Sequence, residues 1–88
     1  MLVADYTGQF KKDYKLAMKR GFDISLIDNL IRNLINEKPL QEKYKDHALS
    51  GNYTGYRECH IKPDWLLIYQ IGNGVIVFER TGSHSDLF

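Results

Sequence analysis

Three histidines, an aspartate, an arginine and two aromatic residues gather in the second half of this sequence. They are His47, His60, Asp64, Trp65, Arg80, His84 and Phe88. Imidazole and carboxylate groups transfer protons, a guanidinium binds phosphate, and aromatic rings stack on bases. Cleavage of RNA without a metal ion requires these groups. The residue types therefore point to chemistry on an RNA backbone.

The length and composition limit the kind of fold that can position these groups. The chain has 88 residues, and we expect residues 1–88 to form a single domain. A chain this short buries only about 60 to 65% of its unfolded surface, so one small core is expected. A deep cofactor cavity does not fit this size, and we predict neither a cofactor nor a metal. The 43% hydrophobic and 26% charged content is typical of a soluble globular protein.

The sequence favours a cytoplasmic protein. Its N-terminus has no basic stretch, and its short apolar run is interrupted at Asp5, so it does not read as a secretory signal. No transmembrane stretch is evident. The single cysteine, Cys59, fits a reducing compartment and is expected to be a small core residue.

The net charge of +1 hides an uneven distribution of basic residues. Lys11, Lys12 and Lys15 crowd the first helical stretch, where Asp13 is the only acid. A local positive patch can follow an RNA backbone, so these three lysines are candidate RNA-binding residues. The alternative is the solvated face of an amphipathic helix, which is the commoner arrangement. Three more lysines, Lys38, Lys43 and Lys45, follow in the middle of the chain.

Hydrophobic periodicity predicts a short strand and two helices in the first half. Residues 2–6 read as the strand. Thr7 then caps a helix that runs through Arg20, with Phe10, Tyr14, Ala17 and Met18 on its apolar stripe and Gly21 as its stop. A second helix begins after Asp23 and ends at Pro39. Residues 39–54 show no clear period and are predicted to form a loop that holds His47.

The second half predicts an antiparallel meander. Residues 56–61, 65–71 and 75–80 alternate with a period of two, and turn residues join them. The middle strand is apolar on both faces, so it should lie centrally with helices on one side. The expected fold class is therefore α+β, with two N-terminal helices packed on one face of a small, mainly antiparallel sheet.

Strand alternation indicates which polar side chains share a face. Glu58 and His60 lie on the same face of their strand. On the last strand Arg80 shares a face with Phe78 and Ile76, and His84 follows on that face if the extended path continues. Arg80 and His84 would then reach one phosphate. Alternation alone leaves open whether the face with His60 and the face with Arg80 coincide.

Three motifs occur in the order D-H-x-L, H-x-x-P-D-W and R-x-G-x-H-x-x-L-F. They begin at Asp46, His60 and Arg80. Together with the Gly55-Tyr56-Arg57-Glu58-Cys59 run, they make the chain resemble the YafQ branch of the RelE/ParE toxins of bacterial toxin-antitoxin modules. The resemblance covers nearly the whole chain, and the joint occurrence of the motifs is more specific than any one of them.

The resemblance implies a ribosome-dependent mRNA interferase that a cognate antitoxin holds inactive. The residues that match the family's cleavage residues are His47, His60, Asp64, Arg80 and His84, with Trp65 and Phe88 as aromatic partners. Two departures are Glu58, where a relative has aspartate, and the weak net charge, which bears on ribosome binding. The antitoxin is expected to cover the basic helix and the sheet face. The mRNA is expected to be held in cleavage geometry by contacts with the ribosome and its RNA.

Elementary RNA chemistry gives these residues roles. Cleavage needs a base for the 2′-OH and an acid for the departing 5′-oxygen, and histidine suits both near neutral pH. We assign the acid to His84 and the base to His60 and Asp64 together, although Asp64 could instead orient His60. Arg80 would bind the phosphate. His47 would add a phosphate contact or share the base role.

Simpler interpretations stay open for several of these residues. Trp65 begins a buried strand and could be core, and Phe88 would fray unless it docks. His60, Asp64 and His84 could also bind zinc, although no CxxC or HExxH pattern supports this. A different function is that of ParE-type relatives, which inhibit DNA gyrase by protein contact without catalysis.

Overall fold

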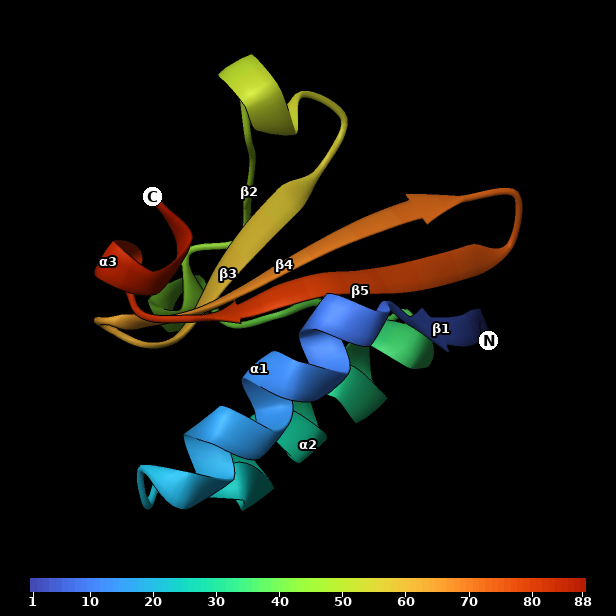
Figure 1. Cartoon of the computed structure of the whole chain (residues 1–88). Coiled ribbons are helices and arrows are strands. Elements are labelled where there is room, and N and C mark those ends of the chain that lie inside the picture. Colours follow the sequence, from blue (N-terminus) through green and yellow to red (C-terminus); the bar gives the residue numbers. More distant parts are fainter.

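A five-stranded sheet with two helices packed on one face makes up this protein. The computed structural model describes all 88 residues (Figure 1). The elements are β1 (Val3–Tyr6), α1 (Gly8–Lys19), α2 (Ile24–Ile35), η1 (Glu42–Tyr44), β2 (His47–Ala48), η2 (Gly51–Tyr53), β3 (Arg57–Lys62), β4 (Trp65–Gly72), β5 (Val75–Gly82) and α3 (His84–Leu87). The strand order is β1-β5-β4-β3-β2, and only the β1–β5 pair is parallel. The α+β prediction is confirmed.

The central strand β4 divides two hydrophobic clusters between the faces of the sheet. Leu67 and Tyr69 belong to the larger cluster, under α1 and α2. Leu66 and Ile68 point the other way and form a small cluster with Leu87 of α3. Cys59 is fully buried in the larger cluster, as expected for a core residue. No helix has the length and apolar character needed to cross a membrane.

Several predicted boundaries need correction. The Thr7 cap and the start of α2 after Asp23 are confirmed, but α2 ends at Ile35 and not at Pro39. A Schellman motif ends it, because Glu37 takes a left-handed conformation (φ 57°) and Lys38 N donates to Asn33 O. Met18 is 54% exposed and lies off the apolar stripe.

The segment predicted as a loop, residues 39–54, contains ordered structure. It holds η1, β2 and η2, and His47 lies on β2 instead of in a loop. The two-residue strand β2 pairs with Arg57 and Glu58 of β3. A strand this short has no alternating pattern, so periodicity does not predict it.

One extra residue in β5 reverses the side-chain alternation near its end. Tyr69 pairs with Phe78 and the preceding residue Ile68 pairs with Arg80, which leaves Glu79 as a bulge. The expectation that Arg80 shares a face with Phe78 is therefore wrong. Phe78 lies in the core under the helices, whereas Arg80 lies on the same face as Ile68.

Thr7, the N-cap residue of α1, holds this bulge in place. Thr7 Oγ1 donates to the carbonyl of Glu79 (2.8 Å) and accepts from the backbone N–H of Phe10 (2.9 Å). The side chain therefore joins the start of α1 to the irregular part of β5. Beyond this point β1 no longer pairs with β5, and α1 lies beside it.

An ion pair joins α1 to β5 just past the bulge. Asp13 is buried and accepts from Arg80 Nε (2.7 Å), Arg80 Nη2 (3.3 Å) and Thr81 N (3.2 Å). Gln9 Nε2 donates to the same carboxylate (3.0 Å). The hydrogen bond to Asp13 raises the pKa of Arg80, so the guanidinium stays charged.

We expect Thr7→Ala to lower the free energy of unfolding by about 1–2 kcal/mol, because it removes both the helix cap and the bond to the bulge. Thr7→Ser keeps the hydroxyl and should stay within about 0.5 kcal/mol of the wild type. Urea denaturation measures both changes. An alanine variant as stable as the wild type would contradict the proposed role of the cap.

We expect Asp13→Asn to cost about 2–3 kcal/mol, because Arg80 loses its buried carboxylate partner. Asp5→Asn is the matched control, since Asp5 is exposed and accepts only from the neighbouring Tyr6 N–H. The control should change stability by less than about 0.5 kcal/mol in the same urea titration. Equal effects of the two variants would show that the Asp13–Arg80 pair does not stabilise the fold.

Candidate active site

Strand register places four residues in one row across the face opposite α1 and α2. His47 pairs with Glu58, Glu58 with Ile68, and Ile68 with Arg80. Paired residues project to the same face of a sheet, so the side chains of the row share that face. Neighbouring strands lie about 4.8 Å apart, which separates the backbones of Glu58 and Arg80 by about 10 Å.

A second row brings His84 beside His60. His60 pairs with Leu66 and Leu66 pairs with Gly82, after which the chain turns into α3. The expected extended path to His84 is therefore wrong, because Ser83 caps a helix that begins at His84. The rings of His60 and His84 nevertheless lie edge to face with centroids 5.9 Å apart.

Local contacts fix the position of α3. Ser83 and Asp86 form a reciprocal capping box, and Arg20 donates to Asp86 (2.7 Å). That hydrogen bond from Arg20 holds the pKa of Asp86 well below its usual range. A Cβ atom on Gly82 would lie 2.9 Å from Asp86 Cβ, so the tight entry into α3 requires glycine. These contacts set where His84 lies.

Glu58 is a buried carboxylate between two histidines. It is 5% exposed, and its Oε1 lies 3.2 Å from His47 Nε2 and 3.3 Å from His60 Nε2. The two rings are 6.3 Å apart between centroids. A buried carboxylate needs such partners, because desolvation of an unpaired charge is costly. Glu58 is hydrogen-bonded to His47 and lies within ion-pair distance of His60, so the three side chains form one cluster.

Asp64 orients His84. Its Oδ1 lies 2.6 Å from His84 Nδ1 and accepts from the backbone N–H of His84 (2.9 Å). The backbone hydrogen bond, and then the side-chain one, lower the pKa of Asp64. This arrangement leaves His84 Nε2 without a partner in the protein. That nitrogen is free to exchange a proton with a substrate.

Arg80 and two aromatic rings complete this face. Only Nε and Nη2 of Arg80 bond to Asp13, so Nη1 is not engaged by it. Tyr53 lies close enough to add to the raised pKa of Arg80, after the hydrogen bond from Arg80 to Asp13. Phe88 packs edge-on against Tyr53, with ring centroids 5.7 Å apart, and remains 63% exposed. Phe88 is thus docked, and a free part of its ring faces solvent.

The structure gives Trp65 a core position. It is 3% exposed, its ring packs against Phe22 at 4.9 Å, and its indole N–H donates to Thr81 Oγ1 (3.0 Å). No face of the ring is open to a base. The stacking role predicted for Trp65 is therefore wrong, and the core interpretation describes it.

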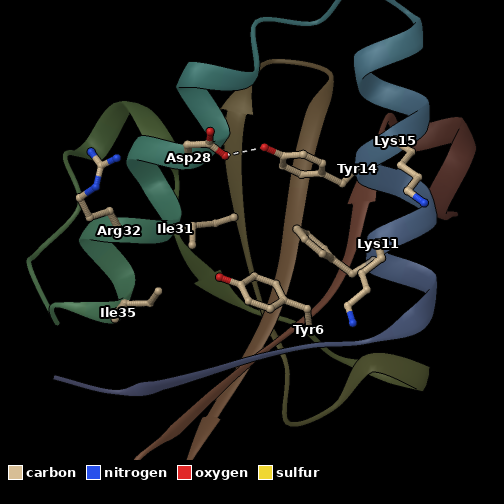
Figure 2. A pocket seen from close by; sticks show the side chains of 9 residues that line it. Tyr6, Lys11, Tyr14, Lys15, Asp28, Ile31, Arg32 and Ile35 are labelled. Atoms are coloured by element: carbon tan, nitrogen blue, oxygen red, sulfur yellow. Dashed lines mark hydrogen bonds between the residues drawn. The ribbon is translucent and has the colours of Figure 1, made fainter.

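The candidate lysines of α1 lie away from the histidines. Lys11 and Lys15 line a groove of about 660 Å³ between α1 and α2, which Figure 2 shows from close by. Tyr14 donates to Asp28 across this groove (2.8 Å), and burial raises the pKa of Tyr14 to about 12. Lys12 is exposed on α1 and does not line the groove. The structure does not bring these lysines to the face with His60.

The side chains best placed to hold a metal ion differ from those that the sequence suggested. Ligand atoms of His47, Glu58 and His60 all lie within 4.8 Å of one another. The zinc alternative named His60, Asp64 and His84 instead. Imidazole and carboxylate groups fit a transition metal, so this cluster has suitable donors.

The role of Glu58 was not predicted from the sequence. Strand alternation predicted that Glu58 and His60 share a face, but the position of Glu58 opposite His47 depends on the pairing of β2. The roles of Asp13 and Tyr53 were not predicted either, since each contacts Arg80 only through the fold. No spacing rule along the chain reveals such partners.

Comparisons with known proteins agree with this fold. The family model described as "Bacterial toxin of type II toxin-antitoxin system, YafQ" matches residues 2–88. The mRNA interferase toxin YafQ of Escherichia coli K12 is 48% identical over 85 residues, covering 96% of this chain and 92% of the relative.

Two solved structures are also similar. One is the E. coli DinJ-YafQ complex, with a TM-score of 0.93, 46% identity and coverage of 100% of this chain and 99% of that chain. The other is a metal-bound toxin from Helicobacter pylori, with a TM-score of 0.93, 47% identity and full coverage of both chains. The chain therefore belongs to the YafQ family of toxins from bacterial type II toxin-antitoxin systems.

Proposed function

We propose that this protein is an mRNA interferase that cleaves translated mRNA on the ribosome, by attack of a 2′-OH on the adjacent phosphate without a metal ion. The observation that carries the proposal is the placement of Glu58, His60 and His84 on one face of the sheet. A carboxylate with an imidazole and a second imidazole with a free nitrogen supply a base and an acid. The name of the 48% identical relative, an mRNA interferase, supports this activity.

Glu58 and His60 fit the base role better than Asp64 does. Both Asp64 hydrogen bonds go to His84, whereas Glu58 contacts His60 directly. In the proposed step, the Glu58–His60 pair takes the proton of the 2′-OH. The 2′-oxygen then forms a bond to phosphorus in line with the 5′-oxygen, whose bond to phosphorus breaks.

His84 supplies the proton for the leaving group. Its Nε2 gives a proton to the departing 5′-oxygen, so the products are a 2′,3′-cyclic phosphate and a 5′-hydroxyl. Asp64 holds Nδ1 and so fixes the ring, and it stabilises the charged imidazolium in the way that a carboxylate does in a catalytic triad. Asp64 is thus a positioning residue in this scheme.

Arg80 stabilises charge on the phosphate, and His47 supports the base. Arg80 presents Nη1 while Asp13 holds Nε and Nη2, which keeps the guanidinium oriented at little further entropic cost. His47 Nε2 contacts Glu58 and its Nδ1 contacts the carbonyl of Ala48, so in this scheme His47 positions Glu58. Phe88 offers an exposed ring on which a base can stack, an interaction typically worth about 1–3 kcal/mol.

The proposed partners are ribosome-bound mRNA and a cognate antitoxin. The site lies on a face of the sheet, and the ribosome is expected to impose the in-line geometry on the mRNA. The related YafQ is found in a complex with DinJ, which supports an antitoxin for this chain. The gyrase-inhibitor alternative has no support from these relatives, and it would need none of the acid and base groups.

We expect Glu58→Gln and His84→Gln each to reduce cleavage by about 10²–10⁴-fold, because each removes a proton-transfer group. Primer extension on a translated mRNA after induction measures the loss. Glu37→Gln is the control, since Glu37 is exposed and pairs only with the N-terminal amine, so its cleavage should match the wild type. A correctly folded His84→Ala variant that keeps full toxicity would instead favour a non-catalytic inhibitor.

We expect the isolated protein to cut naked RNA weakly and ribosome-bound mRNA efficiently, with no effect of EDTA on either. The comparison uses one transcript with and without translating ribosomes, analysed on the same sequencing gel. Efficient, site-selective cutting of naked RNA would contradict ribosome dependence. Loss of cleavage in EDTA that Zn²⁺ or Cu²⁺ restores would replace the metal-free scheme with one using His47, Glu58 and His60 as ligands.

A further inference from the structure

A basic pocket opens on the other side of His60 from His84. The short strand β2 pairs only with Arg57 and Glu58, so the edge of β3 beyond them is not covered by a strand. The 3-10 helix η1 packs there instead. The resulting pocket, of about 550 Å³, is lined by Lys43, Tyr44, Lys45, His60 and Lys62, among others.

We propose that this pocket binds the RNA strand next to the scissile phosphate, taking one flanking nucleotide. This inference rests on the proposed function and adds a substrate subsite to it. His60 belongs both to the pocket and to the acid–base group, so a strand with its phosphate between His60 and His84 continues directly into the pocket.

The charges of the pocket suit a phosphate. Lys43, Lys45 and Lys62 line it, and none of them takes part in an ion pair within the protein. No carboxylate is among its lining residues. The groove between α1 and α2 differs, because Asp28 is part of its wall. Unpaired ammonium groups with no acid beside them attract a phosphodiester and release its counterions on binding.

The size and the aromatic wall suit a nucleotide. Ligand pockets typically measure about 300–1,000 Å³, and this pocket falls within that range. Tyr44 is half-buried and supplies a ring at the wall, with Lys43 Nζ 5.1 Å from its centroid. An aromatic ring beside free cations is the usual combination in sites that bind single-stranded nucleic acid.

The test measures binding of a short, fluorescently labelled 2′-O-methyl oligoribonucleotide, which lacks the attacking hydroxyl and is not cleaved. Fluorescence anisotropy at several salt concentrations gives the dissociation constant and its salt slope. We expect the double variant Lys43→Gln/Lys45→Gln to bind roughly tenfold more weakly, with a salt slope lower by about one to two. Tyr44→Ala should weaken binding about fivefold or more.

The matched control is Lys19→Gln/Lys38→Gln, which removes the same charge from exposed positions outside the pocket. We expect it to weaken binding by less than about threefold, and thermal denaturation confirms that all variants fold. Equal weakening by both double variants would overturn the proposal, because net charge alone would explain it. Unchanged binding by the Lys43/Lys45 variant would overturn it as well.

A further measurement separates substrate RNA from ribosomal RNA. If the Lys43/Lys45 variant keeps oligonucleotide binding but loses cleavage on the ribosome, the pocket contacts the ribosome and the substrate assignment is overturned. The oligonucleotide assay involves no cleavage step. If the wild type binds the oligonucleotide through the pocket but does not cut mRNA, the proposed function is refuted and the proposed RNA-binding pocket is retained.

Discussion

One extra residue in β5, Glu79, decides which face of the sheet carries Arg80. Regular alternation would place Arg80 beside Phe78, under the helices, where its charge would meet the hydrophobic core. The bulge moves Arg80 to the face that holds Glu58 and lets it reach Asp13 at the edge of the sheet. Thr7 caps α1 and bonds to the bulge, so the first helix and the active face are positioned together.

The two faces of the sheet have different roles. The face under α1 and α2 is apolar and supplies most of the buried core. The other face buries a smaller cluster beneath α3 and leaves its polar side chains in the surrounding positions. Glu58 is the exception, because it is both buried and charged, and its two histidine neighbours offset the cost of its desolvation.

Periodicity and capping were sufficient to predict the helices, the β3–β4–β5 meander and the α+β layout. Thr7 illustrates this, since a threonine just before an amphipathic stretch commonly caps a helix. The types of the reacting residues were also readable, and His47, His60 and Arg80 do lie on one face.

The rest depended on contacts between distant segments. The Glu79 bulge follows from packing against α1 and has no local pattern. The strand β2 is too short for a period, so the partner of Glu58 was hidden. A tryptophan can either stack on a base or pack in a core. Only the burial of Trp65 against Phe22 shows that it packs in the core. Asp13, a lone acid among lysines, gave no sign that it binds Arg80 across the fold.

The most direct test of the account is a crystal structure of the protein with a 2′-O-methyl dinucleotide, which cannot be cleaved. The account predicts that its phosphate lies within hydrogen-bonding distance of His84 Nε2 and Arg80 Nη1, with the 2′-oxygen beside His60 and Glu58. A phosphate bound in the groove between α1 and α2, with the histidines free of contact, would contradict it.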